Sequence, residues 1–138
     1  MCKLLERLLE MRHGPAMYLG KDSLLAVTNY ITGYEAAAKD AGVPCDGLRG
    51  FDEWVNLRML LPPGSTRWSG RISSAAGTTH QHTHPDARDA EQRECWLFFE
   101  WLEEFAAERA ARGVDAIIAE HDTFAWPEVV EDWEGDEE

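Results

Sequence analysis

The sequence is poor in basic residues. Thirteen Lys and Arg stand against 26 Asp and Glu, which gives a formal net charge of −13 at pH 7. A surface of this sign repels nucleic acids and anionic membranes, and it attracts basic partners at a salt-dependent rate. We therefore expect neither direct DNA or RNA binding nor binding to a membrane. The partners of this protein should carry basic surfaces.

Cysteines are few and lack the spacing of a metal site. Cys2, Cys45 and Cys95 are far apart in the chain and form no C-x-x-C pair. This pattern indicates neither a disulfide framework nor a zinc knuckle. We predict three reduced thiols, with Cys95 buried on an apolar helix face.

Long apolar runs and glycine-rich phosphate loops are also missing. Charged residues interrupt every turn of the N-terminal segment, and no stretch approaches the ~20 apolar residues of a membrane span. Gly14 and Gly20 bracket Pro15 and bulky residues, so they do not resemble a phosphate-binding loop. We expect a soluble, cytoplasmic protein.

Apolar residues at helical spacing are plentiful, and they indicate the fold class. A chain of 138 residues with 44% hydrophobic residues is long enough for one domain around one core. The clearest helix covers residues 22–41, because its apolar residues recur at steps of three and four. These residues are Leu24, Val27, Ile31, Tyr34 and Ala38.

The complete pattern predicts a mainly α, single-domain bundle of four to five helices with one short irregular or β segment. Helices are expected at 3–12, 22–41, 51–61 and 86–112, and residues 114–121 suit a short helix or a strand. Asp22 or Ser23 should cap the second helix, and Asp86 should cap the helix that ends at Gly113. The Asp22–Ala41 and Asp86–Arg112 helices should pack together at the centre.

Two connecting segments are harder to interpret. Residues 14–20 form a turn that Pro15 and Gly20 should hold in one conformation. Its apolar residues 17–19, Met-Tyr-Leu, are expected to fill the junction between two helices, and an exposed binding loop is the alternative. The segment around Trp68 and Ile72 suits a short strand or an irregular loop, followed by a polar loop at 73–86.

The candidate chemical groups are histidines. His80, His82 and His84 would face one side of an extended segment and could chelate Zn, Ni or Cu. A solvated polar loop is the favoured interpretation, so we predict no metal and no other cofactor. His121-Asp122 resembles a base with its orienting carboxylate, but no nucleophile is recognisable beside it. A helix cap by His121 is preferred, and no catalytic residue is predicted.

The C-terminal segment holds the candidate partner-binding residues. We divide the chain into a helical domain, 1–125, and an acidic tail, 126–138, whose last eleven residues carry seven acidic side chains and no basic one. Such a tail is either a solubilising segment or an interface that anchors on tryptophan and steers a basic partner. The candidate residues are Trp126, Glu128, Glu131, Asp132, Trp133 and Glu134.

Several motifs resemble those of a known group of proteins. They are Arg12-x-Gly-Pro-x-Met-Tyr-Leu-Gly20, Ser23-Leu24, Gly33-Tyr34, Gly50-Phe-x-x-Trp-Val55 and Phe98-Phe-x-x-Leu-x-x-Phe105. Together they resemble small bacterial proteins that look like immunity proteins of polymorphic or contact-dependent toxin systems. The likeness extends from about Leu8 to Phe105, although His13-Gly14-Pro15-Ala16 replaces the Arg-Pro-Gly-type lead of that group.

This resemblance implies a fold and a role, and it supplies no active-site residue. The implied role is a non-enzymatic inhibitor that binds and neutralises a cognate toxin, whose basic cleft would accept the acidic surface of this chain. A small metal-binding or metal-sensing protein, using His80, His82 and His84, is the alternative.

Overall fold

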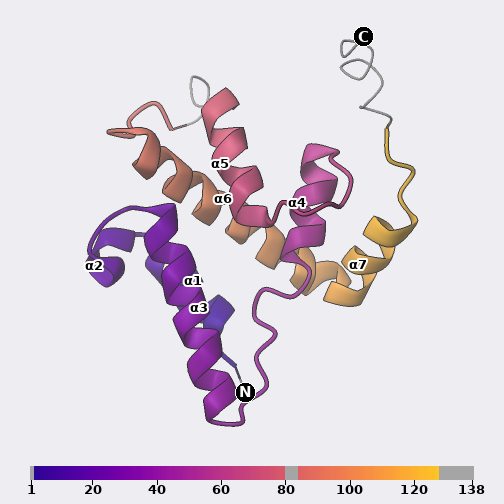
Figure 1. Cartoon of the computed structure of the whole chain (residues 1–138), viewed down its shortest axis with the longest axis horizontal. Coiled ribbons are helices and arrows are strands. Elements are labelled where there is room, and N and C mark those ends of the chain that lie inside the picture. Colours follow the sequence, from indigo (N-terminus) through magenta and orange to yellow (C-terminus); the bar gives the residue numbers. More distant parts are fainter. Residues whose placement is uncertain (1, 80–83, 128–138) are drawn as a thin grey trace.

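Seven segments of the chain form helices in a computed structural model that describes residues 2–79 and 84–127 (Figure 1). They are α1 (Leu4–Met11), α2 (Pro15–Leu19), α3 (Leu24–Asp40), α4 (Phe51–Met59), α5 (Trp68–Thr79), α6 (Ala90–Arg112) and α7 (Val114–Thr123). No strand occurs within those ranges, which confirms the predicted mainly α class. The expected number of helices was too low, because α2 and α5 were not foreseen. None of the helices in the described part of the chain has the length and apolar character needed to cross a bilayer.

Helix α6 is the central element, and α1, α3, α4, α5 and α7 all pack against it. It can contact so many neighbours because its apolar residues occupy more than one face; the buried ones are Cys95, Leu97, Phe98, Phe99, Trp101, Leu102 and Phe105. The side chain of Asp89 caps its start by accepting a hydrogen bond of 2.8 Å from the backbone N–H of Gln92. The predicted cap, Asp86, lies three residues too early. Gly113, with φ of 88°, ends the helix as expected.

An aromatic cluster around Phe51 joins α4, α5 and α6. The Phe51 side chain is fully buried. Its ring centroid lies 5.2 Å from that of Trp68 on α5 and 5.1 Å from that of Phe105 on α6. The rings of Trp54 and Phe98 lie 6.0 and 5.9 Å away. Offset and edge-to-face ring pairs add to the free energy gained by burying these large side chains.

Helix α5 replaces the strand or loop predicted around Trp68 and Ile72. Trp68, Ile72, Ala75 and Ala76 are buried, at the i, i+4, i+7 and i+8 spacing of a helix. The backbone N–H of Trp68 at its start donates a 2.8 Å hydrogen bond to Asp52 Oδ1 on α4. The helix is therefore capped from a different helix. Residues 73–79 of the polar loop predicted at 73–86 belong to α5 instead.

In the N-terminal half, the structure agrees more closely with the elements predicted from the sequence. Ser23 caps α3 by accepting from the Ala26 N–H at 3.2 Å. Leu24, Val27, Ile31 and Ala38 of the predicted stripe are buried, and α3 packs against α6 as expected. Helix α1 buries Leu4 and Leu8.

Cys2 and Cys45 form a disulfide in this structure, with their Cα atoms 4.7 Å apart. The prediction of three reduced thiols was therefore wrong for this pair. The bond connects the start of α1 to the loop between α3 and α4, so two segments separated by 43 residues in sequence are joined. Cys95 is free and buried, as predicted.

Gly50 offers a test of how closely α4 and α7 approach. Its φ is 93°, and a Cβ added there would lie 2.6 Å from Val114 Cγ2. Gly42 has φ of 74° and nothing within 4 Å of an added Cβ, so it is a control for backbone strain alone.

We expect Gly42→Ala to lower the free energy of unfolding by about 1 kcal/mol. Gly50→Ala should cost about 1–3 kcal/mol more, because it adds overpacking. Urea denaturation followed by tryptophan fluorescence measures both values, and equal losses would contradict the close approach.

Candidate binding groove

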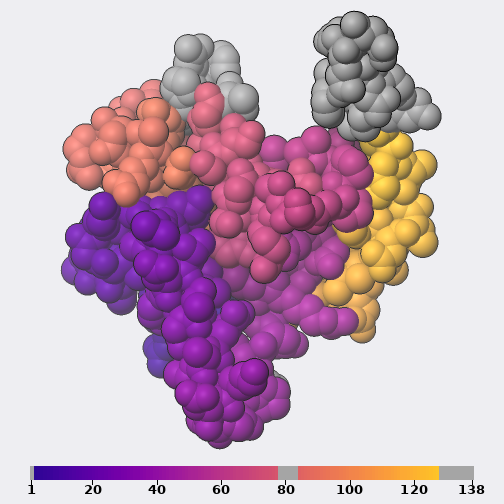
Figure 2. Space-filling view, viewed as in Figure 1, coloured from indigo at the N-terminus to yellow at the C-terminus, as the bar shows by residue number. Residues whose placement is uncertain are grey.

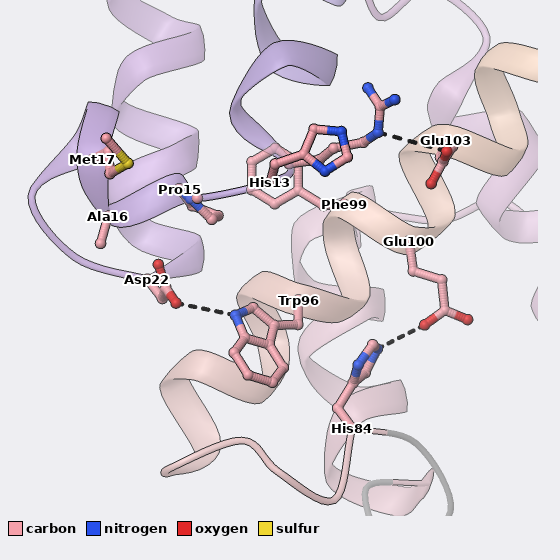
Figure 3. A pocket seen from close by; sticks show the side chains of 12 residues that line it. His13, Pro15, Ala16, Met17, Asp22, His84, Trp96, Phe99, Glu100 and Glu103 are labelled. Atoms are coloured by element: carbon pink, nitrogen blue, oxygen red, sulfur yellow. Dashed lines mark hydrogen bonds and ion pairs between the residues drawn. The ribbon is translucent and has the colours of Figure 1, made fainter.

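A groove of about 490 Å³ lies between the α1–α2 connection and one face of α6 (Figure 3). One wall is formed by residues 12–17, and Asp22 and His84 line it as well. The opposite wall comes from α6, whose lining residues recur at i, i+3, i+4 and i+7 and so share one helix face. These residues are Trp96, Phe99, Glu100 and Glu103.

The short helix α2 is fixed to α6 through Asp22. Pro15 occupies the first helical position and is buried, and Gly20 ends the helix with φ of 89°. Two residues later, Asp22 Oδ2 accepts hydrogen bonds from Trp96 Nε1 at 3.0 Å and from Gln92 Nε2 at 2.9 Å. Figure 3 shows the indole nitrogen of Trp96 directed toward this carboxylate. The segment is thus an ordered turn, as predicted, and it contains a helix.

Two of the three apolar residues at 17–19 are exposed, contrary to the prediction that they fill a junction. Met17 is 89% exposed and Tyr18 59%, whereas Leu19 is partly buried against the core. The reason is helical geometry. Pro15 and Leu19, at i and i+4, face inward, so the residues between them face solvent. Leu25, at the start of α3, is also 68% exposed. The exposure of Met17 and Tyr18 agrees with the alternative of an exposed binding loop, but the segment is a helix, and its binding role stays a prediction.

The groove carries more negative than positive charge. It is lined by three carboxylates, one guanidinium and two histidines. Glu103 Oε2 lies 3.5 Å from Arg12 Nε, and Glu100 Oε1 lies 2.6 Å from His84 Nε2. The Oδ1 atom of Asp22 is buried and has no hydrogen-bond partner within the described residues. With neutral histidines, the formal charge of the lining residues is negative.

Only one residue of the predicted histidine cluster can be placed. His84 contacts Glu100, and its ring centroid lies 5.9 Å from that of Trp96 in an edge-on arrangement. His80 and His82 lie outside the described residues. Within residues 2–79 and 84–127, no three His, Cys, Asp or Glu side chains gather as metal ligands would. The metal-binding alternative therefore gains no support from the described part of the chain.

His121 has a structural position that the sequence did not reveal. It is buried, and its Nε2 lies 3.2 Å from Asn56 Nδ2 on α4, while its Nδ1 lies 3.1 Å from Asp122 Oδ1. The Asn56 amide nitrogen can only donate, so Nε2 is the acceptor in this contact. The predicted helix cap by this side chain was wrong, because the imidazole connects α7 to α4. Both ring nitrogens are already engaged.

Trp126 is the one residue of the predicted partner-binding set that the structure describes. It is half-buried, with its ring centroid 5.2 Å from His121 and 4.6 Å from Phe124. Helix α7, which it follows, lies at the opposite end of the molecule from α2 (Figures 1 and 2). The structure therefore does not bring Trp126 to the groove. The other members of that set lie outside the described residues: Glu128, Glu131, Asp132, Trp133 and Glu134.

No family model, curated protein or solved structure matches this chain.

The exposure of Met17 can be tested by its effect on stability. Met17→Ser should change the free energy of unfolding by less than about 0.5 kcal/mol, because the side chain buries almost nothing. Leu19→Ser, two residues later, removes a side chain that packs against the core and should cost about 2 kcal/mol or more. Thermal or urea unfolding of the two variants gives the comparison. A larger loss for Met17→Ser than for Leu19→Ser would contradict this orientation of α2.

Proposed function

We propose that this protein is a non-enzymatic, immunity-type inhibitor that binds and neutralises a cognate bacterial toxin. The observation that carries the proposal is the α2 turn, an ordered backbone that exposes Met17, which lines the acidic groove, and the adjacent Tyr18. Methionine and tyrosine are enriched at protein–protein interfaces, and this adjacent pair is exposed on an ordered helix. The same turn is part of the motif that resembles immunity proteins.

Two groups that could have performed catalysis have structural roles instead. Burial, reinforced by the negative charge of Asp22, raises the pKa of the Cys95 thiol to about 12. At neutral pH this thiol is protonated and is a poor nucleophile. His121 Nε2 contacts Asn56 on α4, and Nδ1 contacts the neighbouring Asp122, so both ring nitrogens already have partners within the chain. These contacts favour a binding function.

The charge of the chain indicates the chemistry of the partner. A net charge of −13 complements a basic surface, and toxins that act on nucleic acids or nucleotides use basic clefts to hold phosphate. An acidic inhibitor can occupy such a cleft in place of the substrate. The proposal retains the acidic tail as the steering element, with Glu128, Glu131, Asp132 and Glu134 raising the association rate and with Trp126 and Trp133 as anchors.

A cytoplasmic location is part of the proposal, because such toxins have their targets there. The Cys2–Cys45 disulfide is the observation that opposes this location, since disulfides persist mainly in oxidising compartments. In the cytoplasm we expect this pair to be reduced, with the α1 contacts to α6 retaining the fold.

The neutralisation test uses the gene next to the one that encodes this protein, because immunity and toxin genes are normally adjacent. Expression of the neighbouring product alone should arrest growth, and co-expression of this protein should restore growth and yield a purified complex. The proposal is wrong if the neighbouring product is harmless or if its toxicity persists despite co-expression of the folded protein.

The tail makes a separate kinetic prediction. Truncation after Trp126 removes seven acidic residues, so association with the toxin should become slower and less dependent on salt. Trp133→Ala should mainly accelerate dissociation, because a buried aromatic anchor determines the residence time. Surface plasmon resonance at low and high salt measures both rates. Identical kinetics for the full-length and truncated proteins would exclude a steering role for the tail.

A further inference from the structure

We infer that the groove between α2 and α6 receives an arginine side chain from a loop of the partner protein. This inference deepens the proposed function, and it rests on that proposal for the identity of the partner. It concerns the chemistry of the contact, for which the chain offers three independent observations.

The first observation is charge. Asp22, Glu100 and Glu103 line the groove, whereas Arg12 is its one fixed positive charge within the described residues. The neighbouring pair Lys21–Glu91, 3.2 Å apart, adds no net charge. A cation entering the groove is therefore attracted, and an anion is repelled. Within the described part of the chain, Asp22 Oδ2 accepts from Trp96 and Gln92, whereas its Oδ1 atom has no hydrogen-bond partner.

The second observation is shape. On the α6 wall, Trp96 and Phe99 are followed one turn later by Glu100 and Glu103, so aromatic side chains lie beside carboxylates (Figure 3). Phe99 is buried, whereas Trp96 is partly exposed and supplies the accessible ring. A guanidinium group is planar. It can stack one face on an aromatic ring while its edge donates hydrogen bonds to carboxylates. A lysine ammonium lacks this planar fork, so the groove should prefer arginine.

The third observation is a similar contact elsewhere on the same helix. The guanidinium carbon of Arg58 lies 4.8 Å from the ring centroid of Trp101 and 5.4 Å from that of Trp54, and the same side chain pairs with Glu104. Trp101 and Glu104 are therefore an aromatic residue and a carboxylate on α6 that together hold an arginine. In the groove, Trp96 and Glu100 are a comparable pair, spaced i and i+4, and they face His84 rather than an arginine.

The groove carboxylates remain accessible to a partner. The side chains of Glu100 and Glu103 are 40% and 61% exposed, although each already has an intramolecular contact. An incoming guanidinium can share or replace these contacts, which bridge partly exposed side chains and so contribute little to stability. Met17, on the opposite rim, can contact the apolar surface of the same partner loop.

The test uses two small probes that differ in charge and have nearly the same shape, N-acetyl-arginine amide and N-acetyl-citrulline amide. Each is titrated into the ¹⁵N-labelled full-length protein and followed by NMR. The arginine probe should shift the Trp96 indole N–H resonance in a saturable manner, because this group donates to Asp22 in the groove. The citrulline probe should not shift it. Equal shifts with both probes, or shifts that lie only outside the groove, would overturn the inference.

Matched variants on α6 locate the contact. Glu100→Gln and Glu103→Gln should each weaken binding of the arginine probe about two- to fivefold, the size expected for partly exposed charge pairs. Glu104→Gln also removes one charge and one ion pair from α6, but its carboxylate does not line the groove, so binding should be unchanged. Equal weakening by Glu103→Gln and Glu104→Gln would show a nonspecific charge effect and would overturn the inference.

The probe experiment tests the arginine preference of the groove, the neutralisation test addresses the proposed function, and either can fail without the other. If the probe binds in the groove but no toxin is neutralised, the proposed function is wrong and the arginine preference stands. If neutralisation is complete for the double variant Glu100→Gln/Glu103→Gln, the groove is not the toxin-docking site, and the proposed function stands. Loss of neutralisation in this variant, with Glu104→Gln fully active, supports both.

Discussion

The packing of Phe51 against its aromatic neighbours is the interaction on which the rest of this fold depends. One buried ring contacts side chains of α4, α5 and α6, and these three helices share no strand or disulfide that could substitute for it among the described residues. Burying a side chain of this size contributes about 3 kcal/mol from apolar area alone. Ring–ring geometry adds about 0.5–1.5 kcal/mol for each pair. Because α6 is fixed by this cluster on one side, its other side can serve as a rigid support for α1, α3 and the groove.

The groove follows from this arrangement. Trp96 projects from α6 toward the turn that precedes α3, and its indole N–H meets the Asp22 carboxylate. A short helix such as α2 would not persist alone in water, so its order depends on such tertiary contacts. The same contacts hold Met17 and Tyr18 outward before any partner arrives. A surface that is already ordered loses less conformational entropy on binding, which favours affinity.

The sequence predicted those elements whose determinants are local. The stripe of α3, the inner face of α6 and the Gly113 terminus all follow from spacing and capping rules within one helix. Helix α5 carries the correct spacing too, but its serines and two glycines obscured it, and its cap comes from Asp52, 16 residues before Trp68. The His121–Asn56 contact joins residues 65 apart and has no local signal. For α2, five residues were too few for a periodicity, so the outward direction of Met17 was missed.

In the candidate site too, local features were predictable from the sequence and contacts between distant segments were not. The acidic and aromatic residues of α6 were recognised as one helix, but only the fold places them opposite the α2 turn. The most direct test of the account is hydrogen–deuterium exchange of this protein with and without its toxin. The account predicts that the toxin protects the segments around residues 12–25 and 94–105, which form the turn and the groove. Protection of α7 with none around residues 12–25 and 94–105 would contradict the account, because α7 lies at the opposite end of the molecule from α2 and the groove beside it.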